Sequence, residues 1–369
     1  MKLNSNHTFN RYSSEISFRI PVQVLGVLLA VLVFTACSDD PLEDALEVEL
    51  SGVLVANEGN FSEPDGSLTQ FDPENGQVIQ QKFEQANNRE LAGIIQSVVR
   101  GGERLYIVTN NINKVEVVDA QTLESLETIT FDNGLTPAGF AFASESKGYI
   151  SDLFGNSVAV LNLETYEVTD TRIDVGMAPQ DMVVSSGRLF VANSGFGDDQ
   201  TVSVIDIDAD EVVSTIEVGN NPVQLTIDSQ ERIWVVSHGK RAFEESENDI
   251  PGRIDVIDSS TLQLIATVET GGFPTALTLS EELDLAWVVN EDRVHQIELS
   301  SINMLDESFI SRSFNGIGYS TVENRLYLAH SRGFVQAGQA IIYDLEGAAV
   351  DSFQVGIAPF DFLFQVEGD

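Results

Sequence analysis

Residues 175–222 read VGMAPQDMVVSSGRLFVANSGFGDDQTVSVIDIDADEVVSTIEVGNNP, and this stretch decides the fold. It begins and ends on Val-Gly-x-x-Pro. Four short apolar runs lie between these elements, rich in Val and Ile and bounded by turn residues, a composition typical of β-strands. We expect strands at Asp181–Val184, Leu189–Asn193, Val202–Asp206 and Glu211–Val218. Four strands within about 45 residues, after which the pattern begins again, indicate one blade of a β-propeller.

The same unit recurs seven times along the chain. A Gly-x-x-Pro element precedes the first strand of five copies and begins at Gly134, Gly176, Gly219, Gly271 and Gly356. Each copy has a large side chain, aromatic in six of the seven, at one position of its second strand: Leu54, Tyr106, Tyr149, Phe190, Trp234, Trp287 and Tyr327. The repeat predicts an all-β fold, a seven-bladed β-propeller of four-stranded antiparallel blades that occupies residues 53–369.

The order of the strands predicts how the ring closes. The chain enters the repeat at Val53 with a second strand, and residues 355–364 end it on a first strand. We therefore expect the C-terminal strand to complete the N-terminal blade, which leaves no open sheet edge between the two ends.

The N-terminus has the pattern of a secretory signal. Lys2, Arg11 and Arg19 precede an apolar run at residues 22–36, which is short for a membrane span and has the length of a signal-peptide core. Cys37, the only cysteine of the chain, follows Phe-Thr-Ala and resembles the lipidated cysteine of lipoprotein signals. An ordinary signal peptide with an incidental cysteine is the alternative.

These features predict a lipid-anchored protein. We assign residues 1–36 to a lipoprotein signal peptide and residues 37–52 to lipidated Cys37 and an acidic tether. Ser38-Asp39-Asp40 resembles the acidic export signal of lipoproteins that reach the cell exterior. We expect the protein at the outer membrane and on the cell surface.

The charge excludes some partners. Acidic residues outnumber basic ones 58 to 19, and the formal net charge is −39. Because such a surface repels nucleic acids and anionic lipids, we expect no nucleic-acid binding and membrane contact only through the lipid on Cys37. A solvated surface suited to salty water explains the acidity as well.

One repeat carries a family resemblance. Arg188-Leu-Phe-Val-Ala-Asn-Ser194, together with Val218-Gly-Asn-Asn-Pro222, resembles the YVTN-repeat (YncE-like) seven-bladed propellers. The resemblance covers residues 53–367 and implies the fold. It implies little about function, because propellers of this kind serve many roles.

Polar residues are predicted to gather at one mouth of the central channel. Three residues after each second-strand marker the chain has Asn57, Thr109, Asp152, Asn193, Ser237, Asn290 and His330. The first strands begin near Gln96, Gly139, Asp181, Gln224, Ala276, Gly318 and Asp361. Because first and second strands run antiparallel, we expect the two rings to meet on one face. These groups contact a ligand there, or they only satisfy buried backbone and hold channel water.

The loops between second and third strands open on that face and are unequal in length. The longer ones are Glu58–Gly66, Ser194–Gln200, His238–Gly252 and Ser331–Gly338. Recognition usually resides in such loops, although cations and aromatics also fall on solvated loops by chance. The candidate ligand-binding residues are Asn57, Asn60, Phe61, Asp152, Phe154, Asn193, Phe196, His238, Lys240, Arg241, Phe243, Asn290, His330, Arg332 and Phe334.

Catalysis finds little support in the residues. Asp206, Asp208, Asp210 and Glu217 match an EF-hand, but Glu211 stands where that loop needs glycine. The chain has no G-x-S-x-G motif, and we predict no enzyme activity and no cofactor. The alternative is a Ca²⁺-dependent, lactonase-like hydrolase with the ion held by Asn57, Asp152, Asn193 and Asn290.

A lipid-anchored propeller of this type resembles the surface lipoproteins that accompany TonB-dependent transporters. The resemblance implies capture of a large nutrient, such as cobalamin or an iron–siderophore, and its transfer to the transporter. A large, flat ligand also suits a rim of loops better than a small pocket. An adhesive or structural protein that uses the same rim against another protein is the alternative.

Overall fold

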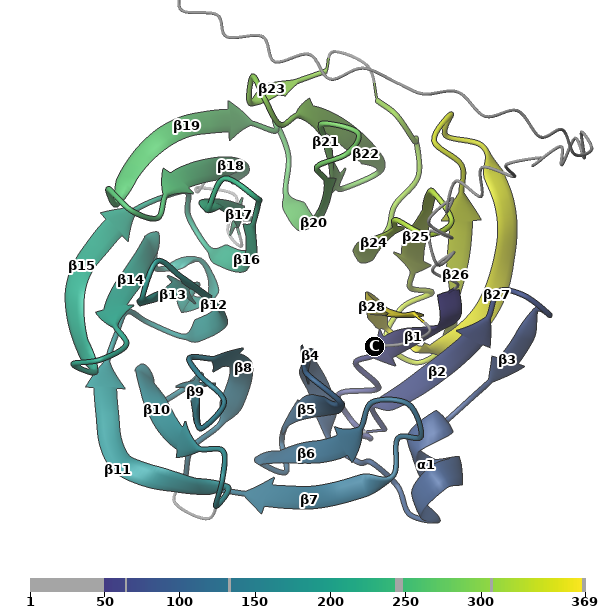
Figure 1. Cartoon of the computed structure of the whole chain (residues 1–369). Coiled ribbons are helices and arrows are strands. Elements are labelled where there is room, and N and C mark those ends of the chain that lie inside the picture. Colours follow the sequence, from purple (N-terminus) through teal and green to yellow (C-terminus); the bar gives the residue numbers. More distant parts are fainter. Residues whose placement is uncertain (1–49, 64, 132–133, 243–247, 306–307, 367–369) are drawn as a thin grey trace, which may run out of the picture. The chain divides into compact units, whose positions relative to one another are not determined.

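The computed structural model describes residues 50–63, 65–131, 134–242, 248–305 and 308–366. The expected signal peptide, Cys37 and nearly all of the expected tether lie outside the described residues. Seven four-stranded antiparallel sheets surround a central axis as blades (Figure 1). This arrangement confirms the predicted seven-bladed β-propeller.

Each blade runs from an innermost strand at the axis to an outermost strand at the circumference. The innermost strands are β28 (Pro359–Val366), β4 (Ile94–Gly101), β8 (Pro137–Phe142), β12 (Pro179–Ser185), β16 (Pro222–Ile227), β20 (Pro274–Ser280) and β24 (Gly316–Ser320). The second strands are β1 (Leu50–Asn57), β5 (Arg104–Asn110), β9 (Lys147–Asp152), β13 (Arg188–Asn193), β17 (Arg232–Lys240), β21 (Leu285–Asn290) and β25 (Arg325–His330).

The outer half of each blade follows in the same order. The third strands are β2 (Ser67–Asp72), β6 (Lys114–Asp119), β10 (Ser157–Asn162), β14 (Thr201–Asp206), β18 (Ile250–Asp258), β22 (Arg293–Glu298) and β26 (Ala337–Tyr343). The outermost strands are β3 (Gln77–Ile79), β7 (Ser125–Thr130), β11 (Glu167–Asp174), β15 (Glu211–Glu217), β19 (Gln263–Glu269), β23 (Asn303–Met304) and β27 (Ala349–Ile357).

Proline marks the start of the innermost strands. Five of them begin at the proline of a Gly-x-x-Pro element: Pro137, Pro179, Pro222, Pro274 and Pro359. Proline has no N–H to donate, and the first residue of a strand is where a sheet tolerates it. The structure thus confirms the expected role of this element.

The ring closes as predicted. β28 pairs antiparallel with β1, and Val53 faces Phe364 while Val55 faces Phe362. The first blade therefore has the strand order β28-β1-β2-β3. β1 begins at Leu50, three residues before the expected start of the propeller.

The apolar core lies between neighbouring blades. The second-strand markers are at most 3% exposed, and two of them stack on an aromatic residue of the next blade's innermost strand. The Tyr106 ring lies 4.8 Å from that of Phe140, and the Trp287 ring lies 5.2 Å from that of Tyr319. Adjacent blades therefore share one core, and each depends on the next for burial.

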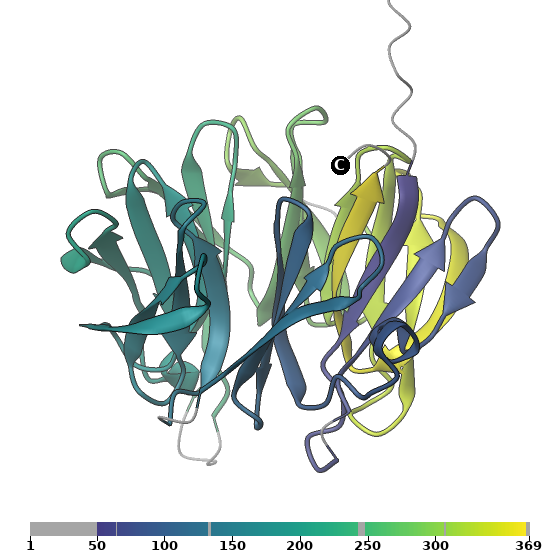
Figure 2. The ribbon, with the colours of Figure 1, turned by 60° about the horizontal axis from the view of Figure 1, so that its bottom comes forward.

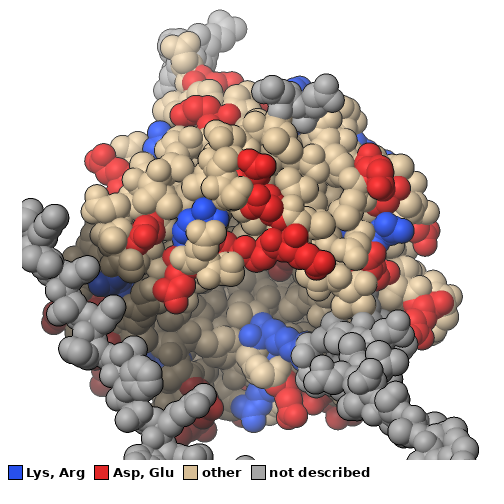
Figure 3. All heavy atoms as spheres, turned by 45° about the horizontal axis from the view of Figure 1, so that its top comes forward, with Lys and Arg blue, Asp and Glu red and all other residues tan. Residues whose placement is uncertain are grey.

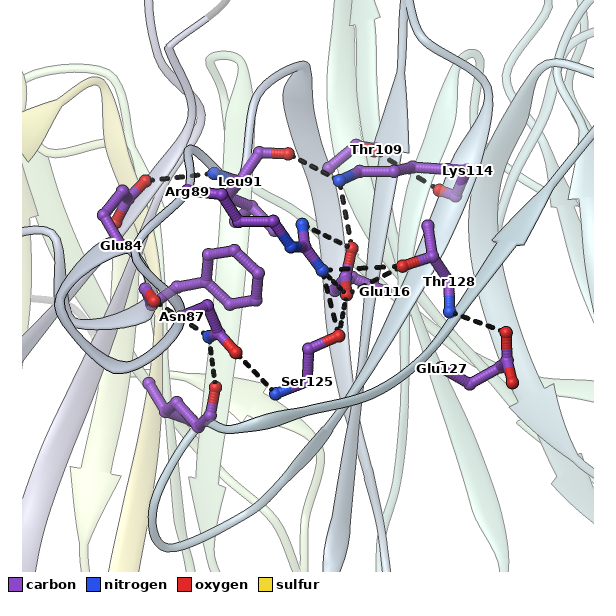
Figure 4. Close-up of polar contacts among 12 residues, drawn as sticks. Glu84, Asn87, Arg89, Leu91, Thr109, Lys114, Glu116, Ser125, Glu127 and Thr128 are labelled. Atoms are coloured by element: carbon purple, nitrogen blue, oxygen red, sulfur yellow. Dashed lines mark hydrogen bonds and ion pairs between the residues drawn. The ribbon is translucent and has the colours of Figure 1, made fainter.

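A helical insertion interrupts this regularity between the first and second blades. α1 (Lys82–Asn87) buries Phe83, and the chain after it carries Arg89 to the buried Glu116 of β6 (Figure 4). The Glu116 carboxylate also accepts hydrogen bonds from Lys114 Nζ (3.1 Å) and Thr128 Oγ1 (3.0 Å). Burial alone would raise the pKa of Glu116. Hydrogen bonds from Arg89 and Ser125 and the charge of Lys114 outweigh burial, and the pKa of Glu116 is lowered.

The described residues include no helix that combines the length and apolar character needed to cross a membrane.

Candidate functional site

The connections between second and third strands all leave the same face of the propeller, which we call the rim face. It forms the lower edge in Figure 2, whereas β1 begins and β28 ends at the upper edge. This confirms that the unequal loops share one face. One predicted boundary is wrong, because β17 extends to Lys240 and β18 begins at Ile250. His238 and Lys240 therefore lie in a strand, where the register of the β17–β18 hairpin fixes their positions.

Four phenylalanine side chains stand out from the rim face. Phe61 is 75% exposed, Phe154 69%, and Phe196 and Phe334 58% each. They come from the first, third, fourth and seventh blades, and we call them the aromatic rim. The Phe154 and Phe196 rings, on neighbouring blades, lie 6.0 Å apart. Exposed aromatics that gather on one face indicate a binding surface. Phe243 lies outside the described residues.

The conformation of Phe196 is unusual. It lies in the short 3₁₀ turn η1 (Gly195–Gly197) with φ 52° and ψ 33°, the left-handed region that non-glycine residues rarely occupy. Ser194 holds this turn, because its Oγ accepts a hydrogen bond from Phe196 N and donates one to Ala178 O (2.9 Å). The loop therefore presents the Phe196 ring at a conformational cost.

The basic residues predicted for the rim do not form a cluster of unpaired charges. Lys240 pairs with Asp198, and Arg241 pairs with Glu291 at 2.6 Å while its guanidinium lies 3.8 Å from the Phe273 ring centroid. Both ion pairs join neighbouring blades, so these side chains contribute to contacts between blades. Arg332 is exposed and contacts Gln339 at 3.5 Å.

The two candidate histidines contact backbone carbonyl groups. His238 Nδ1 lies 3.0 Å from Pro274 O, and His330 Nδ1 lies 3.0 Å from Ser313 O. Burial lowers the pKa of His238. His238 is therefore expected to be neutral at physiological pH and contributes no cation to the rim face.

The polar side chains at the ends of the second strands bond within their own blade or to the segment that leads into it. Asn57 donates to Ser67 O (2.9 Å), Asn193 to Ser203 Oγ (2.9 Å) and Asn290 to Thr270 O (2.9 Å). Each of these side chains is at most 3% exposed, and Asp152 caps backbone N–H groups of Thr136 and Gly155. Strand pairing places these second-strand positions beside the starts of the innermost strands, as expected, with Asn193 opposite Pro179 and Asn290 opposite Pro274. Among the described residues, however, this polar ring does not line the cavity on the propeller axis.

The expected calcium ligands likewise turn into their own blades. Asn57, Asp152, Asn193 and Asn290 belong to four different blades, and each forms hydrogen bonds close to its own position rather than converging on one point. In the described part of the chain, no three His, Cys, Asp or Glu side chains are grouped as metal ligands. Asn60 also has a local role in the first loop, because its backbone N–H donates to Asp65 Oδ1 and its Oδ1 accepts from Ser62 N.

The innermost strands do line a cavity on the propeller axis, which we call the axial cavity. Its volume is about 350 Å³, and every blade contributes to its wall. Six of the seven predicted first-strand positions lie on this wall: Gln96, Gly139, Asp181, Gln224, Ala276 and Asp361. Sequence reasoning missed Glu58, which follows β1 and also faces the cavity.

Three carboxylates face the axial cavity. Burial raises the pKa of Asp181 and of Asp361 to about 6, and the charge of Asp361 adds to the rise at Asp181. Burial also raises the pKa of Glu58. Asp181 accepts 2.8 Å hydrogen bonds from Met182 N and from Leu225 N of the next blade, whereas Asp361 accepts one from Phe362 N.

The fold defines a seven-bladed β-propeller with exposed aromatic side chains on its rim face. The chain belongs to the family described as "Domain of unknown function (DUF5074)", whose profile matches residues 51–240. No curated protein matches the sequence.

Solved structures share the fold at low sequence identity. A quinonprotein alcohol dehydrogenase-like protein from Bacteroides thetaiotaomicron superposes with a TM-score of 0.68 at 14% identity, over 86% of this chain and 79% of that one. A functionally unknown protein from Desulfotomaculum acetoxidans superposes with a TM-score of 0.63 at 12% identity, over 85% of this chain and 99% of that one. The dihydro-heme d1 dehydrogenase NirN superposes with a TM-score of 0.58 at 12% identity, over 88% of this chain and 77% of that one. At these identities the likeness concerns the fold alone.

Proposed function

We propose that this protein is a non-catalytic binding protein whose working surface is the rim face. The observation that carries the proposal is the aromatic rim, four phenylalanines from four blades exposed on one face. Exposing these rings to water is unfavourable, and binding a partner or ligand with apolar surface removes that cost.

The ligand we propose is a large nutrient of the cobalamin or siderophore type, transferred to a TonB-dependent transporter. The resemblance to surface lipoproteins suggests it, and a broad rim suits a ligand too large for a small pocket. The position of β1 supports this arrangement, because the chain enters the propeller at the face opposite the aromatic rim (Figure 2). A lipid on Cys37 would then hold the protein to the outer membrane and leave the rim face accessible.

Calorimetry of the protein without its signal peptide tests the proposal. We expect saturable binding of cobalamin or of a ferric siderophore, weakened at least tenfold by the combined changes Phe61→Ser, Phe154→Ser and Phe196→Ser. The matched control is Val213→Ser with Ile265→Ser, which removes exposed apolar side chains from outermost strands instead. Absence of binding to all these ligands, or equal binding by both variants, would contradict the nutrient proposal.

An adhesive protein that binds another protein through the rim is the second candidate. Ile112, Ile250 and Val335 extend the exposed apolar surface of the rim face beyond the four rings. A broad apolar face with polar surroundings is typical of protein interfaces. Cross-linking on cells distinguishes the candidates: a specific protein adduct lost in the Phe61, Phe154 and Phe196 variant, without small-ligand binding, favours adhesion.

A further inference from the structure

The axial cavity is a feature that the proposed function does not use. Its volume of about 350 Å³ lies in the range of pockets that hold small organic ligands, about 300–1,000 Å³. Its wall comes from the innermost strands of all seven blades together with Glu58. A pocket held by the whole ring is preorganised, because no single loop has to move to form it.

The charge of the wall selects the kind of ligand. Glu58, Asp181 and Asp361 face the cavity, and none of the described residues on its wall is Lys, Arg or His. Carboxylates in a confined space are costly when no cation accompanies them. The cavity is therefore complementary to a positively charged ligand.

Unpaired hydroxyl groups on the same wall are an observation independent of the charges. Ser97 Oγ and Thr275 Oγ1 are buried and lack hydrogen-bond partners among the described residues. Ser97 and Thr275 therefore add uncharged polar residues to a wall that also carries carboxylates. Gln96 and Gln180 add amide groups to the wall, whereas Asn315 Oδ1 already accepts a hydrogen bond from Ser331 N. The cavity thus combines carboxylates with uncharged polar residues, which suits a ligand that carries several N–H donors.

The distribution of the carboxylates favours an extended cation over a metal ion. Asp181 belongs to the fourth blade and Asp361 to the first, so at least two blades separate them in either direction around the ring. A bound Ca²⁺ needs its oxygen ligands clustered around one point, and the described residues hold no such group of acids. Between the polar groups the wall is apolar at Ile95, Val223 and Ile317. Alternating apolar and anionic surface matches an alkyl chain that links ammonium groups.

We propose that the axial cavity binds an aliphatic diamine or polyamine. Its ammonium groups donate hydrogen bonds to the carboxylates of Asp181 and Asp361, and its methylene groups pack against the apolar part of the wall. The proposal does not depend on the aromatic rim, because Asp181 and Asp361 lie on innermost strands.

Titration calorimetry with spermidine and putrescine at pH 7.5 tests the proposal. The propeller surface is rich in Asp and Glu with few Lys and Arg among them (Figure 3), so the buffer contains 0.15 M NaCl to suppress diffuse attraction. We expect one saturable site per chain, weakened at least tenfold by Asp361→Asn. The asparagine side chain of this variant keeps an oxygen that accepts from Phe362 N, so the strand pairing of β28 with β1 is retained.

Two controls make the result decisive. Asp170→Asn removes the same charge from an exposed position of β11 and should leave the affinity unchanged. The Phe61, Phe154 and Phe196 variant should also bind spermidine normally, which separates this site from the rim. Absence of saturable binding, equal weakening by Asp361→Asn and Asp170→Asn, or a Ca²⁺ site abolished by Asp361→Asn while amines fail to bind would each overturn the proposal.

Discussion

Asp361 illustrates how a single residue can serve a site at the expense of stability. Its carboxyl group faces the axial cavity and accepts one hydrogen bond, from Phe362 N. Burial raises its pKa to about 6, so the ionised form that prevails at neutral pH is disfavoured in the folded protein. Asp181 has the same character on the fourth blade. The carboxylates of Asp181 and Asp361 do not stabilise the propeller, and residues kept at a cost in stability are typical of binding sites. This agrees with the proposed binding role of the cavity.

The raised pKa predicts how stability depends on pH. The folded carboxyl group titrates near pH 6 and the unfolded one near 3.8, so the folded protein binds more protons between these values. Stability therefore falls as the pH rises from about 4 to about 6 and stays lower above that. Asp361→Asn removes this loss and should raise the free energy of unfolding at pH 8 by up to about 3 kcal/mol, with little difference near pH 4.

Urea denaturation of both proteins at pH 4, 6 and 8 measures the effect. Asp170→Asn is the control, because its carboxylate is exposed. A difference between Asp361→Asn and wild type that is the same at all three pH values would contradict the assignment.

At the scale of elements, the structure shows how an insertion is fastened to the propeller. α1 has only six residues, too few to form a stable helix alone. Its Phe83 is buried, and Arg89 stacks on that ring at 4.9 Å while its guanidinium pairs with the Glu116 carboxylate (Figure 4). Lys114 Nζ also donates to Leu91 O at 2.6 Å, so charges of β6 hold the chain after the helix in place.

Removing the central carboxylate should release this insertion. Glu116→Ala leaves Lys114 buried without its charge partner, and we expect a loss of about 3 kcal/mol in the free energy of unfolding. Glu124→Ala, at an exposed position of the same blade, should change it by less than about 0.5 kcal/mol. Guanidinium denaturation of the two variants provides the measurement, and similar stabilities would show that the network contributes nothing.

At the scale of the whole molecule, closure of the ring depends on one strand pair. β28 supplies the innermost strand of the first blade, and its Phe362 packs with Tyr327 of the seventh blade. A Cβ added at Gly316 would lie 1.7 Å from Phe360 O, so β24 and β28 approach too closely for any larger residue there. A comparable close approach occurs inside the chain, where a Cβ added at Gly139 of β8 would lie 2.2 Å from Gln180 O of β12. The contact between the seventh and first blades is therefore as close as a contact between consecutive blades.

A chain that ends at Ile357 should lose this closure. The inner edge of β1 and the apolar residues that pack on Phe362 become exposed, and the melting temperature should fall by more than about 10 °C. Circular dichroism melting measures the change. The single change Phe334→Ala, which shortens an exposed ring on the rim, is the control and should leave the melting temperature nearly unchanged. A truncated chain that melts like the full one would refute closure by β28.

The sequence by itself was enough to predict the blades, their number and the way the ring closes. Gly-x-x-Pro elements, buried aromatic markers and the unpaired strands at the two ends are local signals that recur along the chain, and each repeat reinforces the others. It also predicted that Phe61, Phe154, Phe196 and Phe334 lie on exposed loops. These residues stand among Gly, Asp and Ser, which favour turns at the surface, so their side chains do not reach the core.

Only the tertiary structure decided the roles of the polar residues. Lys240 and Arg241 meet acids from neighbouring blades. Asn57 and Asn193 bond within their own sheets, and Asn290 bonds to the connection that leads into its blade. The carboxylates of Asp181 and Asp361 come from distant blades to line one cavity. A repeat pattern specifies which residues are equivalent, but the partners of a charge depend on which side chains the closed ring brings within reach.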